Sequence, residues 1–473
     1  MIADLKPYPK YKDSGLPWLG PVPGHWEVRR LRASIVDCVN GIWGADPNGE
    51  DDLVCIRVAD FDRVNLRVSL KKKTLRAVSP SARSRRLLKK GDLLLEKSGG
   101  GDLQPVGVVV LYHHDEQAVC SNFVARMPLA DGYNSHFINF LHFTLYAYRI
   151  NVRSIKQTTG IQNLDGKAYL SEPVAFPPAE EQAAIVRFLD WTNARLERAI
   201  RAKRKVIALL TEQKQAIIHR AVTRGLDPSV PLKPSGIPWL GDIPKHWEVR
   251  KLRSLFRTQG SGTTPSGDRY YGGLINWVMS GDLNDSVVRV TRRTVHEQAL
   301  TAYSTLKLYP ANSLVVAMYG ATIGKTGILA GNACTNQACC VLAHALPDVN
   351  ASLFQLVLQT AKPHLLREAY GGGQPNINAE VVRSLRVPFP SLKEQNSILA
   401  HVDEATSKLT TTISRLEREI ELLREYRTRL IADVVTGKLD VREAAARLPE
   451  DAPPEVPIPE EDILSEAEPE TVE

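Results

Sequence analysis

The segment YGATIGKT, Tyr319 to Thr326, is the part of the chain that comes nearest to a nucleotide-binding motif. In a P-loop, the residues between the first Gly and the Gly-Lys-Thr let backbone N–H groups surround the phosphates. Gly320 and Gly324 are separated by three residues, one fewer than a P-loop needs. We therefore expect no nucleotide hydrolysis at this segment.

Carboxylates that could hold a catalytic metal occur together in GDLLLEK, which contains Asp92 and Glu96. The related segment NSLVVAM carries Ala317 and Met318 and has no carboxylate. An essential metal site would thus be missing from one copy, so we interpret the first cluster as solvated charge. None of the six cysteines belongs to a CxxC pair, which argues against structural zinc and is typical of reduced thiols.

The remaining motifs do not supply an active site either. The glycine runs at 99–101 and 371–373 lack the GxGxxG spacing of dinucleotide-binding folds. His25 and His246 each stand beside a Trp in a proline-rich segment, which favours a packed cap over a general base. The chain also has no Asn-Pro-Pro-Tyr sequence of the kind used for amino methylation. We therefore expect a non-catalytic chain with no metal site and no cofactor of its own.

The two histidines belong to a long internal repeat. SGLPWLGPVPGHWEVRRLR begins at Ser14 and SGIPWLGDIPKHWEVRKLR at Ser235, with 14 of 19 positions identical. A second pair, VAFPPAEEQAAIVRFLD from Val174 and VPFPSLKEQNSILAHVD from Val387, follows at an offset of 213. Proline followed by an acidic first turn and periodic apolar residues predicts a helix start. The chain is thus built twice, with similar borders and different interiors.

Each second repeat opens a segment with two stripes at heptad spacing, which predicts a long coiled-coil helix. Each helix is expected to end near Gly225 or Gly437, which gives a rod of roughly 65 Å. Three polar residues, Lys203, Lys214 and Arg427, interrupt the stripes. Either their apolar stems lie along the seam and their charged heads reach water, or they set register or mark where a further subunit docks. The helix-packing residues that we expect are Leu189, Leu196, Ile200, Ile207, Leu210, Ile217, Val402, Leu409, Ile413, Leu416, Ile420, Leu423 and Leu430.

Between the repeats, short apolar runs bounded by Gly, Asp and Asn predict strands, and two longer runs predict helices. The order domain, helix, domain, helix lets the second helix pack along the first only if it runs back. The expected fold class is α/β (α+β) domains in tandem, pseudo-two-fold related and joined by two long antiparallel coiled-coil helices. The expected boundaries are globular domain 1 at 1–175, long helix 1 at 176–225, globular domain 2 at 226–388, long helix 2 at 389–445 and an acidic disordered tail at 446–473.

Charge narrows the kind of partner. From Asp451 onward the chain has nine carboxylates, no Lys or Arg, and several prolines, which predicts disorder. Without these carboxylates the net charge rises from +7 to +16. Such a surplus suits nucleic acid, because Lys and Arg displace counterions from phosphates. No apolar run reaches membrane-spanning length and the first residues lack a signal peptide's apolar core, so we expect a cytoplasmic protein.

Taken in order, SGxPWLGxxPxHWEVRxLR, YGATIGK, GGGQPNI and VPFPSLKEQNSI resemble the specificity subunit of type I restriction–modification systems. The resemblance runs from about Tyr11 to Asp440, in duplicate. It implies two target-recognition domains, each reading one half of a bipartite, asymmetric double-stranded DNA site, with the helices setting the spacer. It also implies partners: two methyltransferase subunits along the helices, and motor-nuclease subunits. S-adenosylmethionine, ATP and Mg would belong to those partners.

Gly-rich loops and amide side chains are candidates for DNA contact, since base choice needs forked or amide donors and acceptors. The expected DNA-binding residues are Lys97, Ser98, Gln104, Lys156, Gln157, Thr158, Gln162, Tyr319, Thr322, Lys325, Tyr370, Gln374 and Asn376. Asn163 and Asn376 align at the offset of 213, so this Asn could equally be a structural turn residue. The basic runs at 71–73, 83–90 and 292–293 favour solvated faces over phosphate contacts.

Two other classes of function stay open. A nucleotide-driven enzyme would need the 319–326 loop to hold phosphate. A structural coiled-coil adaptor would show no DNA sequence preference. A specificity subunit could also serve an assembly that only methylates.

Overall fold

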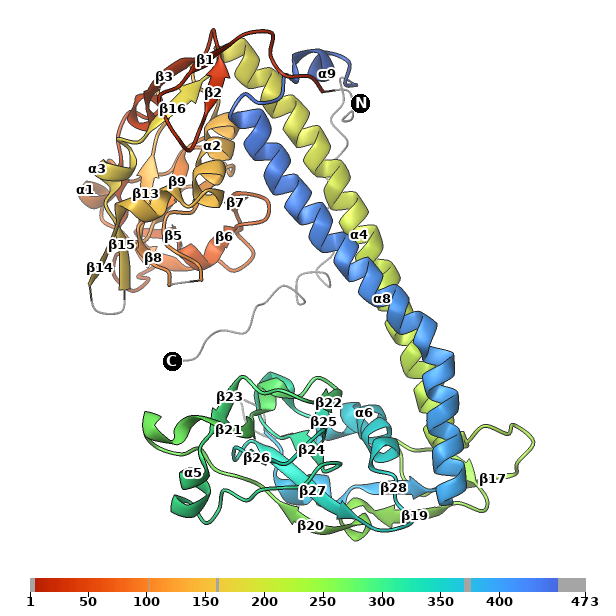
Figure 1. The fold of residues 1–473 in the computed structure, drawn as a ribbon. Coiled ribbons are helices and arrows are strands. Elements are labelled where there is room, and N and C mark those ends of the chain that lie inside the picture. Colours follow the sequence, from red (N-terminus) through yellow and green to blue (C-terminus); the bar gives the residue numbers. More distant parts are fainter. Residues whose placement is uncertain (1–4, 102, 159–160, 370–375, 450–473) are drawn as a thin grey trace. The chain divides into compact units, whose positions relative to one another are not determined.

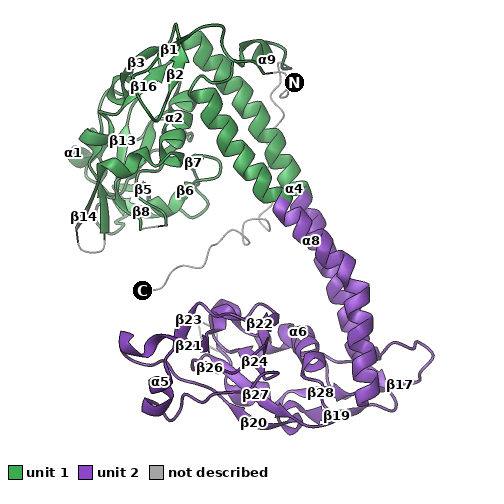
Figure 2. Cartoon of the chain, viewed as in Figure 1, with its two compact units in different colours: residues 1–202, 419–473 green, residues 203–418 purple. Residues whose placement is uncertain are grey.

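The computed structural model of the chain describes residues 5–101, 103–158, 161–369 and 376–449. Its contacts divide the chain into two compact units, which Figure 2 colours separately. Unit 1 holds residues 1–202 and 419–473, and unit 2 holds residues 203–418. The tail expected to be disordered lies outside the described residues from position 450 onward.

Each unit combines short strands with a few helices (Figure 1), and two long helices contribute to both units (Figure 2). The strands of unit 1 are β1 (Tyr11–Asp13), β2 (Pro21–Pro23), β3 (Glu27–Arg30), β4 (Val39–Asn40), β5 (Asp52–Ile56), β6 (Phe61–Asp62), β7 (Arg67–Val68), β8 (Leu75–Ala77), β9 (Leu93–Glu96), β10 (Ser98–Gly99), β11 (Val109–Leu111), β12 (Ala118–Cys120), β13 (Val124–Met127), β14 (Ile155–Thr158), β15 (Ile161–Leu164) and β16 (Pro173–Phe176). The strands of unit 2 are β17 (Leu232–Pro234), β18 (Asp242–Pro244), β19 (Glu248–Lys251), β20 (Phe256–Gly260), β21 (Tyr271–Val278), β22 (Ser286–Val288), β23 (Arg293–Val295), β24 (Leu314–Ala317), β25 (Thr326–Leu329), β26 (Ala333–Thr335), β27 (Cys339–Ala345) and β28 (Arg386–Phe389). The helices are α1 (Pro80–Arg83), α2 (Ser135–Ala147), α3 (Gly166–Tyr169), α4 (Ala179–Arg224), α5 (Glu297–Ala302), α6 (Ala351–Arg367), α7 (Ala379–Ser384), α8 (Leu392–Val435) and α9 (Arg442–Ala446).

The two units share one strand order. The largest sheet of unit 1 runs β4-β13-β9-β11-β7-β6, and that of unit 2 runs β20-β27-β24-β25-β22. A second sheet has the order β12-β5-β8 in unit 1 and β26-β21-β23 in unit 2. Strand directions correspond too, because β11 with β7 and β25 with β22 are parallel, as are β12 with β5 and β26 with β21. The mixed α/β character is confirmed, and the duplication extends from the repeated borders through the interiors.

The central strands β9 and β24 are buried at every residue. Their apolar runs suit strands that are covered on both faces. Helix α2 packs against β11 in unit 1, and α6 packs against β24 and β25 in unit 2. Asn134 caps α2 by accepting backbone N–H groups, and Asn350 caps α6 in the same way. The helices predicted from the longer apolar runs are thus placed over equivalent strands.

One glycine in each unit allows two backbone segments to approach closely. A Cβ added at Gly41 would collide with the carbonyl oxygen of Cys120, and one added at Gly262 with that of Thr335. Cys120 and Thr335 end the corresponding strands β12 and β26. Because any side chain would overlap this carbonyl, both copies of the fold require glycine here.

The long helices α4 and α8 are narrower than the ranges expected for them. Each begins three residues inside its range, after the prolines that follow β16 and β28. Helix α8 ends at Val435, and the short helix α9 is separate from it. Gly225 and Gly437 follow the helices with φ of +73° and +76°, the left-handed conformation in which glycine ends a helix. Every residue expected in the packing seams is buried or half-buried.

Two of the three polar residues of the seams, Lys214 and Arg427, contact the other long helix within their own unit. In unit 1, the Arg427 guanidinium lies 3.7 Å from the Glu197 carboxylate. In unit 2, Lys214 Nζ donates to Thr410 Oγ1 at 3.0 Å. These contacts favour a role in register over the alternative in which the charged ends only reach water.

Among the described residues, we find no helix whose length and apolar character would let it cross a membrane.

Candidate nucleic-acid interface

In unit 1, several expected DNA-binding residues gather on one small sheet with the strand order β10-β15-β14. Asn163 lies in its central strand, opposite Ser98 on one side and opposite Lys156 on the other. Gln157 and Thr158 belong to β14, but their side chains lie outside the described part of the chain. Sheet pairing therefore brings together segments that are about 60 residues apart.

Two amide side chains of this sheet help to build it. Ser98 Oγ donates to Asn163 Oδ1 at 2.6 Å. Gln162 is buried, and its Oε1 accepts the backbone N–H of Val106 at 3.2 Å. Asn163 thus has a structural partner, and the alternative of a structural Asn is favoured at this position. Gln162 is engaged in a similar way, so its Oε1 is available to a base only if this bond weakens.

The lysines of the same region carry the positive charge. Lys97 Nζ donates to Asn40 Oδ1 at 2.6 Å. Lys156 is 74% exposed and its ammonium lies 2.7 Å from the Asp165 carboxylate. The hydrogen bond from Lys156 is the main reason that the pKa of Asp165 falls to about 2. Both lysines are held in defined positions at the surface of unit 1.

In unit 2, the structure brings Tyr319 and Asn376 together as an isolated antiparallel bridge. Tyr319 follows the central strand β24 by two residues, just as Ser98 follows β9. The Tyr319–Asn376 bridge is therefore the counterpart of the Ser98–Asn163 pair. The Tyr319 side chain is 44% exposed. Tyr370 and Gln374, which we expected nearby, lie outside the described residues.

The loop 319–326 does not form a phosphate cradle. The amides of Ile323, Gly324 and Lys325 all donate to backbone carbonyls of the loop or of β24. Thr322 Oγ1 donates to the Tyr319 carbonyl at 2.8 Å. Because a P-loop needs such N–H groups directed at the ligand, the nucleotide-driven alternative has no support from this geometry. Lys325 and Thr322 are half-buried in this turn.

The acidic cluster of unit 1 is neutralised by arginines. The Asp92 carboxylate lies 2.6 Å from the Arg126 guanidinium, and that of Glu96 lies 3.2 Å from that of Arg63. Within the described ranges, no group of three or more His, Cys, Asp or Glu side chains is placed to hold a metal ion. Both carboxylates are buried, so the interpretation of this cluster as solvated charge is wrong, and the two acids act as partners of arginines.

Members of the basic runs also have acidic neighbours. Lys73 Nζ lies 2.7 Å from Glu116, and Lys90 Nζ lies 3.2 Å from Asp115. These pairs are solvent-exposed, so each adds little stability and can be exchanged for other ions. The runs at 71–73 and 83–90 thus carry solvated charge on unit 1, as their composition favoured.

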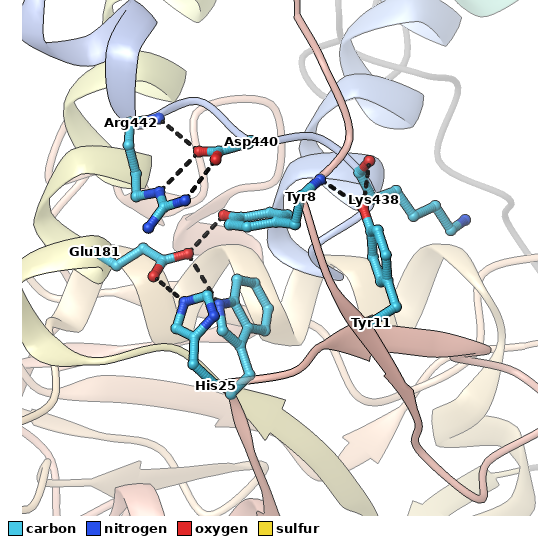
Figure 3. A network of polar contacts seen from close by, with 8 residues as sticks. Tyr8, Tyr11, His25, Glu181, Lys438, Asp440 and Arg442 are labelled. Atoms are coloured by element: carbon cyan, nitrogen blue, oxygen red, sulfur yellow. Dashed lines mark hydrogen bonds and ion pairs between the residues drawn. The ribbon is translucent and has the colours of Figure 1, made fainter.

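The repeated histidines and tryptophans join the globular part of each unit to its long helix. In unit 1, the buried Glu181 carboxylate at the start of α4 accepts from Tyr8 Oη at 2.6 Å and from Trp26 Nε1 at 2.9 Å. His25 Nε2 lies 2.7 Å from the same carboxylate (Figure 3). Burial and the contact with Glu181 raise the pKa of the Tyr8 hydroxyl, which keeps it protonated as a donor. The expectation that His25 belongs to a packed cap is therefore confirmed.

Unit 2 repeats this junction around Glu394. His246 Nε2 lies 2.7 Å from its carboxylate and Trp247 Nε1 donates to it at 3.1 Å. Burial acts to raise the pKa of Glu394, but the hydrogen bonds from His246, Trp247 and Ser391 outweigh it and lower the pKa to about 2. The same three residue types thus anchor both helices.

Unit 1 has one further layer at its junction, formed by the two ends of the described chain. The Asp440 backbone N–H donates to the Lys6 carbonyl at 2.8 Å, and Tyr11 Oη donates to the Lys438 backbone carbonyl at 3.2 Å. Arg442 forms an ion pair with Asp440 at 2.6 Å (Figure 3). In unit 2 a continuous chain, 225–235, takes the place of these two segments.

Two residues beside the unit 1 sheet were not predicted from the sequence, namely Asn40 and Arg63. Asn40 binds Lys97, and Arg63 donates to Gln104 Oε1 at 3.3 Å. Asn40 directly precedes the required Gly41, a signal that a turn lies there. Nothing in the local sequence around Arg63 indicates its partners, because they come from another strand.

Comparisons with known proteins point to one family. Residues 244–422 match the family described as the type I restriction modification DNA specificity domain. The MjaVIII specificity subunit of a type I restriction enzyme from Methanocaldococcus jannaschii is 24% identical over 64% of this chain and 70% of its own length. The EcoBI specificity subunit from Escherichia coli is 22% identical over 68% of this chain and 70% of its own length.

A solved structure has the same fold. A chain from a structure concerned with the complex assembly and conformational transition of the type I R-M system aligns with a TM-score of 0.60. It is 15% identical, and the alignment covers 88% of this chain and 99% of that one. At this identity the likeness concerns the fold alone.

Proposed function

Since the chain is a type I restriction–modification specificity subunit, a DNA-recognition protein and not an enzyme, we propose that it reads a bipartite, asymmetric DNA site. Target-recognition domains at 1–175 and 226–388 would each bind one half of it. The observation that carries this proposal is the shared strand order of the two units, combined with different side chains in the regions after β9 and β24. One fold used twice with different surfaces suits two different half-sites.

The proposed reading surfaces follow the central strand of each unit. In unit 1 the surface comprises the β10-β15-β14 sheet with Lys97 and Lys156, and the adjacent loop with Gln104. In unit 2 it comprises Tyr319 and the neighbourhood of its bridge with Asn376. Lysines position the protein on phosphates, whereas amides, Ser and Tyr can contact base edges.

We propose that α4 and α8 pair as an antiparallel coiled coil along their length and so set the spacer between the half-sites. Glu197 faces Arg427 in unit 1, and Lys214 faces Thr410 in unit 2. From the first pair to the second, α4 advances 17 residues and α8 goes back 17. A single antiparallel register accounts for both contacts, and the apolar seams support it.

We also propose that two methyltransferase subunits dock on the helices. Leu209 on α4 and Leu422 on α8 are 56% and 48% exposed, and they lie outside the packing seams. They are separated by the offset of 213 that relates the two helices. Exposed leucines in equivalent places suit two copies of one partner. Motor-nuclease subunits, S-adenosylmethionine, ATP and Mg would then belong to the remainder of the assembly.

The test of half-site reading is an exchange of residues 1–175 for the corresponding part of another specificity subunit. Methylated positions would be mapped across the genome of a host carrying each version. We expect one half of the recognised sequence to change and the other half to stay. A change in both halves would contradict the assignment of one half-site to each domain. A chain without any sequence preference would support the adaptor alternative.

The ruler is tested by adding one heptad to each helix at facing positions, 207 and 417. Such an insertion keeps the seams in register and lengthens the pair by about 10 Å, which corresponds to about three base pairs of DNA at ~3.4 Å each. We expect the recognised spacer to lengthen by that amount. An unchanged spacer would show that the helices do not determine it. The control adds a heptad to α4 alone, which breaks the register and should abolish recognition.

A further inference from the structure

Glu96 is a buried carboxylate whose role is not explained by the fold. It is the last residue of the central strand β9 and is 1% exposed. Its partner is Arg63, whose NH2 group donates to Oε1 at 3.2 Å and to Oε2 at 3.4 Å. Burial raises the pKa of Glu96, and the Arg63 charge opposes this rise. Burial of a carboxylate at this point costs desolvation free energy, so a fold that needed only an apolar core here would be more stable without it.

The corresponding position in unit 2 has no carboxylate. Ala317 ends the central strand β24, which takes the place of β9 in the same sheet order. The fold therefore forms without an acid at this point. A different acid, Asp60, has a counterpart in unit 2, namely Asp282. Asp60 accepts the backbone N–H of Arg57, and Asp282 accepts the backbone N–H of Met279. Asp60 serves the fold common to both units, whereas Glu96 serves something particular to unit 1.

Arg63 connects this carboxylate to the proposed reading surface of unit 1. Its side chain is 34% exposed, and its NH1 group donates to Gln104 Oε1 at 3.3 Å. It lies in the turn between β6 and β7, where Asp62 Oδ1 accepts the backbone N–H groups of Val64 and Asn65. The turn fixes the backbone of Arg63 and Glu96 fixes its guanidinium. A guanidinium has five N–H donors, so it can keep Glu96 and still bind a base edge.

We propose that Arg63 is a specificity-determining residue that reads a guanine in the half-site bound by unit 1, and that Glu96 is the positioning residue that aims it. A guanidinium held in one orientation matches the O6 and N7 acceptors of guanine. Pre-orientation by a buried carboxylate removes the entropy that a free Arg side chain would lose on binding. The inference rests on the proposed function, because it requires unit 1 to bind one half-site.

The test uses the full chain in its complex with the modification subunits, and duplexes randomised at one position of the site at a time. Arg63→Lys keeps the charge and the pairing with Glu96 but loses the fork, so it should fold. We expect it to lose guanine preference at one position of the unit 1 half-site by about 5- to 150-fold. Glu96→Gln should weaken the same preference, and neither variant should alter the other half-site.

The matched control is Arg57→Lys. Arg57 is 33% exposed and pairs with the buried Asp60 at 2.9 Å. It therefore resembles Arg63 in its exposure and in its pairing with a buried carboxylate. It should leave every base preference unchanged. If Arg63→Lys also leaves all preferences unchanged while the complex binds its site, Arg63 does not read a base and the inference is overturned. If the unaltered chain has no base preference at all, the proposed function itself fails.

Discussion

Loss of Glu181 should open the junction between the globular part of unit 1 and helix α4. The carboxylate is 6% exposed and accepts hydrogen bonds from Tyr8 and Trp26, both of which are buried. Glu181→Ala leaves these two donors without a partner. A buried polar group left unpaired costs about 1–3 kcal/mol, so the variant should lose about 2–6 kcal/mol. His25 is 43% exposed and can turn to water, so it adds little.

Glu394→Ala is the matched variant in unit 2. Its carboxylate accepts from one fully buried donor, Trp247, whereas His246 is 51% exposed and Ser391 is exposed. By the same arithmetic the loss is about 1–3 kcal/mol. The first variant should therefore be the more damaging of the two, because among the described residues only unit 1 has a buried tyrosine that donates to this carboxylate.

Amide hydrogen exchange is the suitable assay, because a chain with two units has no single free energy of unfolding. We would compare protection at 179–190 and at 392–403 in the full chain, with and without each substitution. Glu181→Ala should reduce protection in the first segment and leave the second unchanged, and Glu394→Ala should do the reverse to a smaller extent. Equal losses for the two variants, or no loss for Glu181→Ala, would refute the reasoning from buried donors.

Three further predictions concern the helices, the sheets and pH. Leu209→Asp and Leu422→Asp should each remove about one methyltransferase subunit from the assembly without affecting folding, as measured by native mass spectrometry; a full complement on both variants would contradict the docking proposal. Gly41→Ala and Gly262→Ala should each destabilise their own unit by about 1 kcal/mol or more, because the added methyl overlaps a carbonyl oxygen. Proteolysis at matched temperatures would detect this loss of stability as faster cleavage. Burial lowers the pKa of His142 to about 3, so below about pH 6.5 the unfolded chain takes up a proton that the folded chain cannot accept. The stability of unit 1, which contains His142, should thus fall by about 2 kcal/mol between pH 6.5 and pH 5, and His142→Gln should remove that part of the pH dependence in urea titrations that follow the unfolding of unit 1; an unchanged slope would exclude His142 as its source.

The repeats allowed much of the architecture to be predicted. Strands such as β9 and β24, the helices α2 and α6, and the ends of α4 and α8 at Gly225 and Gly437 all depend on local features. Apolar period, helix starts and terminal glycines act over a few residues and can be read along the chain. The heptad seams were predicted for the same reason, and all of their residues are at least half-buried.

Partners of the polar side chains were much harder to predict. Lys214 and Arg427 interrupt the seams, and whether they reach water or the other helix depends on the residue opposite. Gln162 was expected to face DNA, but it accepts the Val106 N–H inside unit 1. A side chain with donors and acceptors suits both roles, and only its neighbours in space distinguish them.

By itself, the sequence determined that this chain contains one fold twice, two long helices with matching seams, and a surplus of positive charge outside an acidic tail. Those properties follow from residue type and short-range spacing. Only the tertiary structure decided that Arg63 donates to Glu96, that Ser98 donates to Asn163, and that Tyr8 donates to Glu181. Such contacts join residues between 33 and 173 positions apart. They depend on the order and direction of strands in a sheet, which local patterns do not encode.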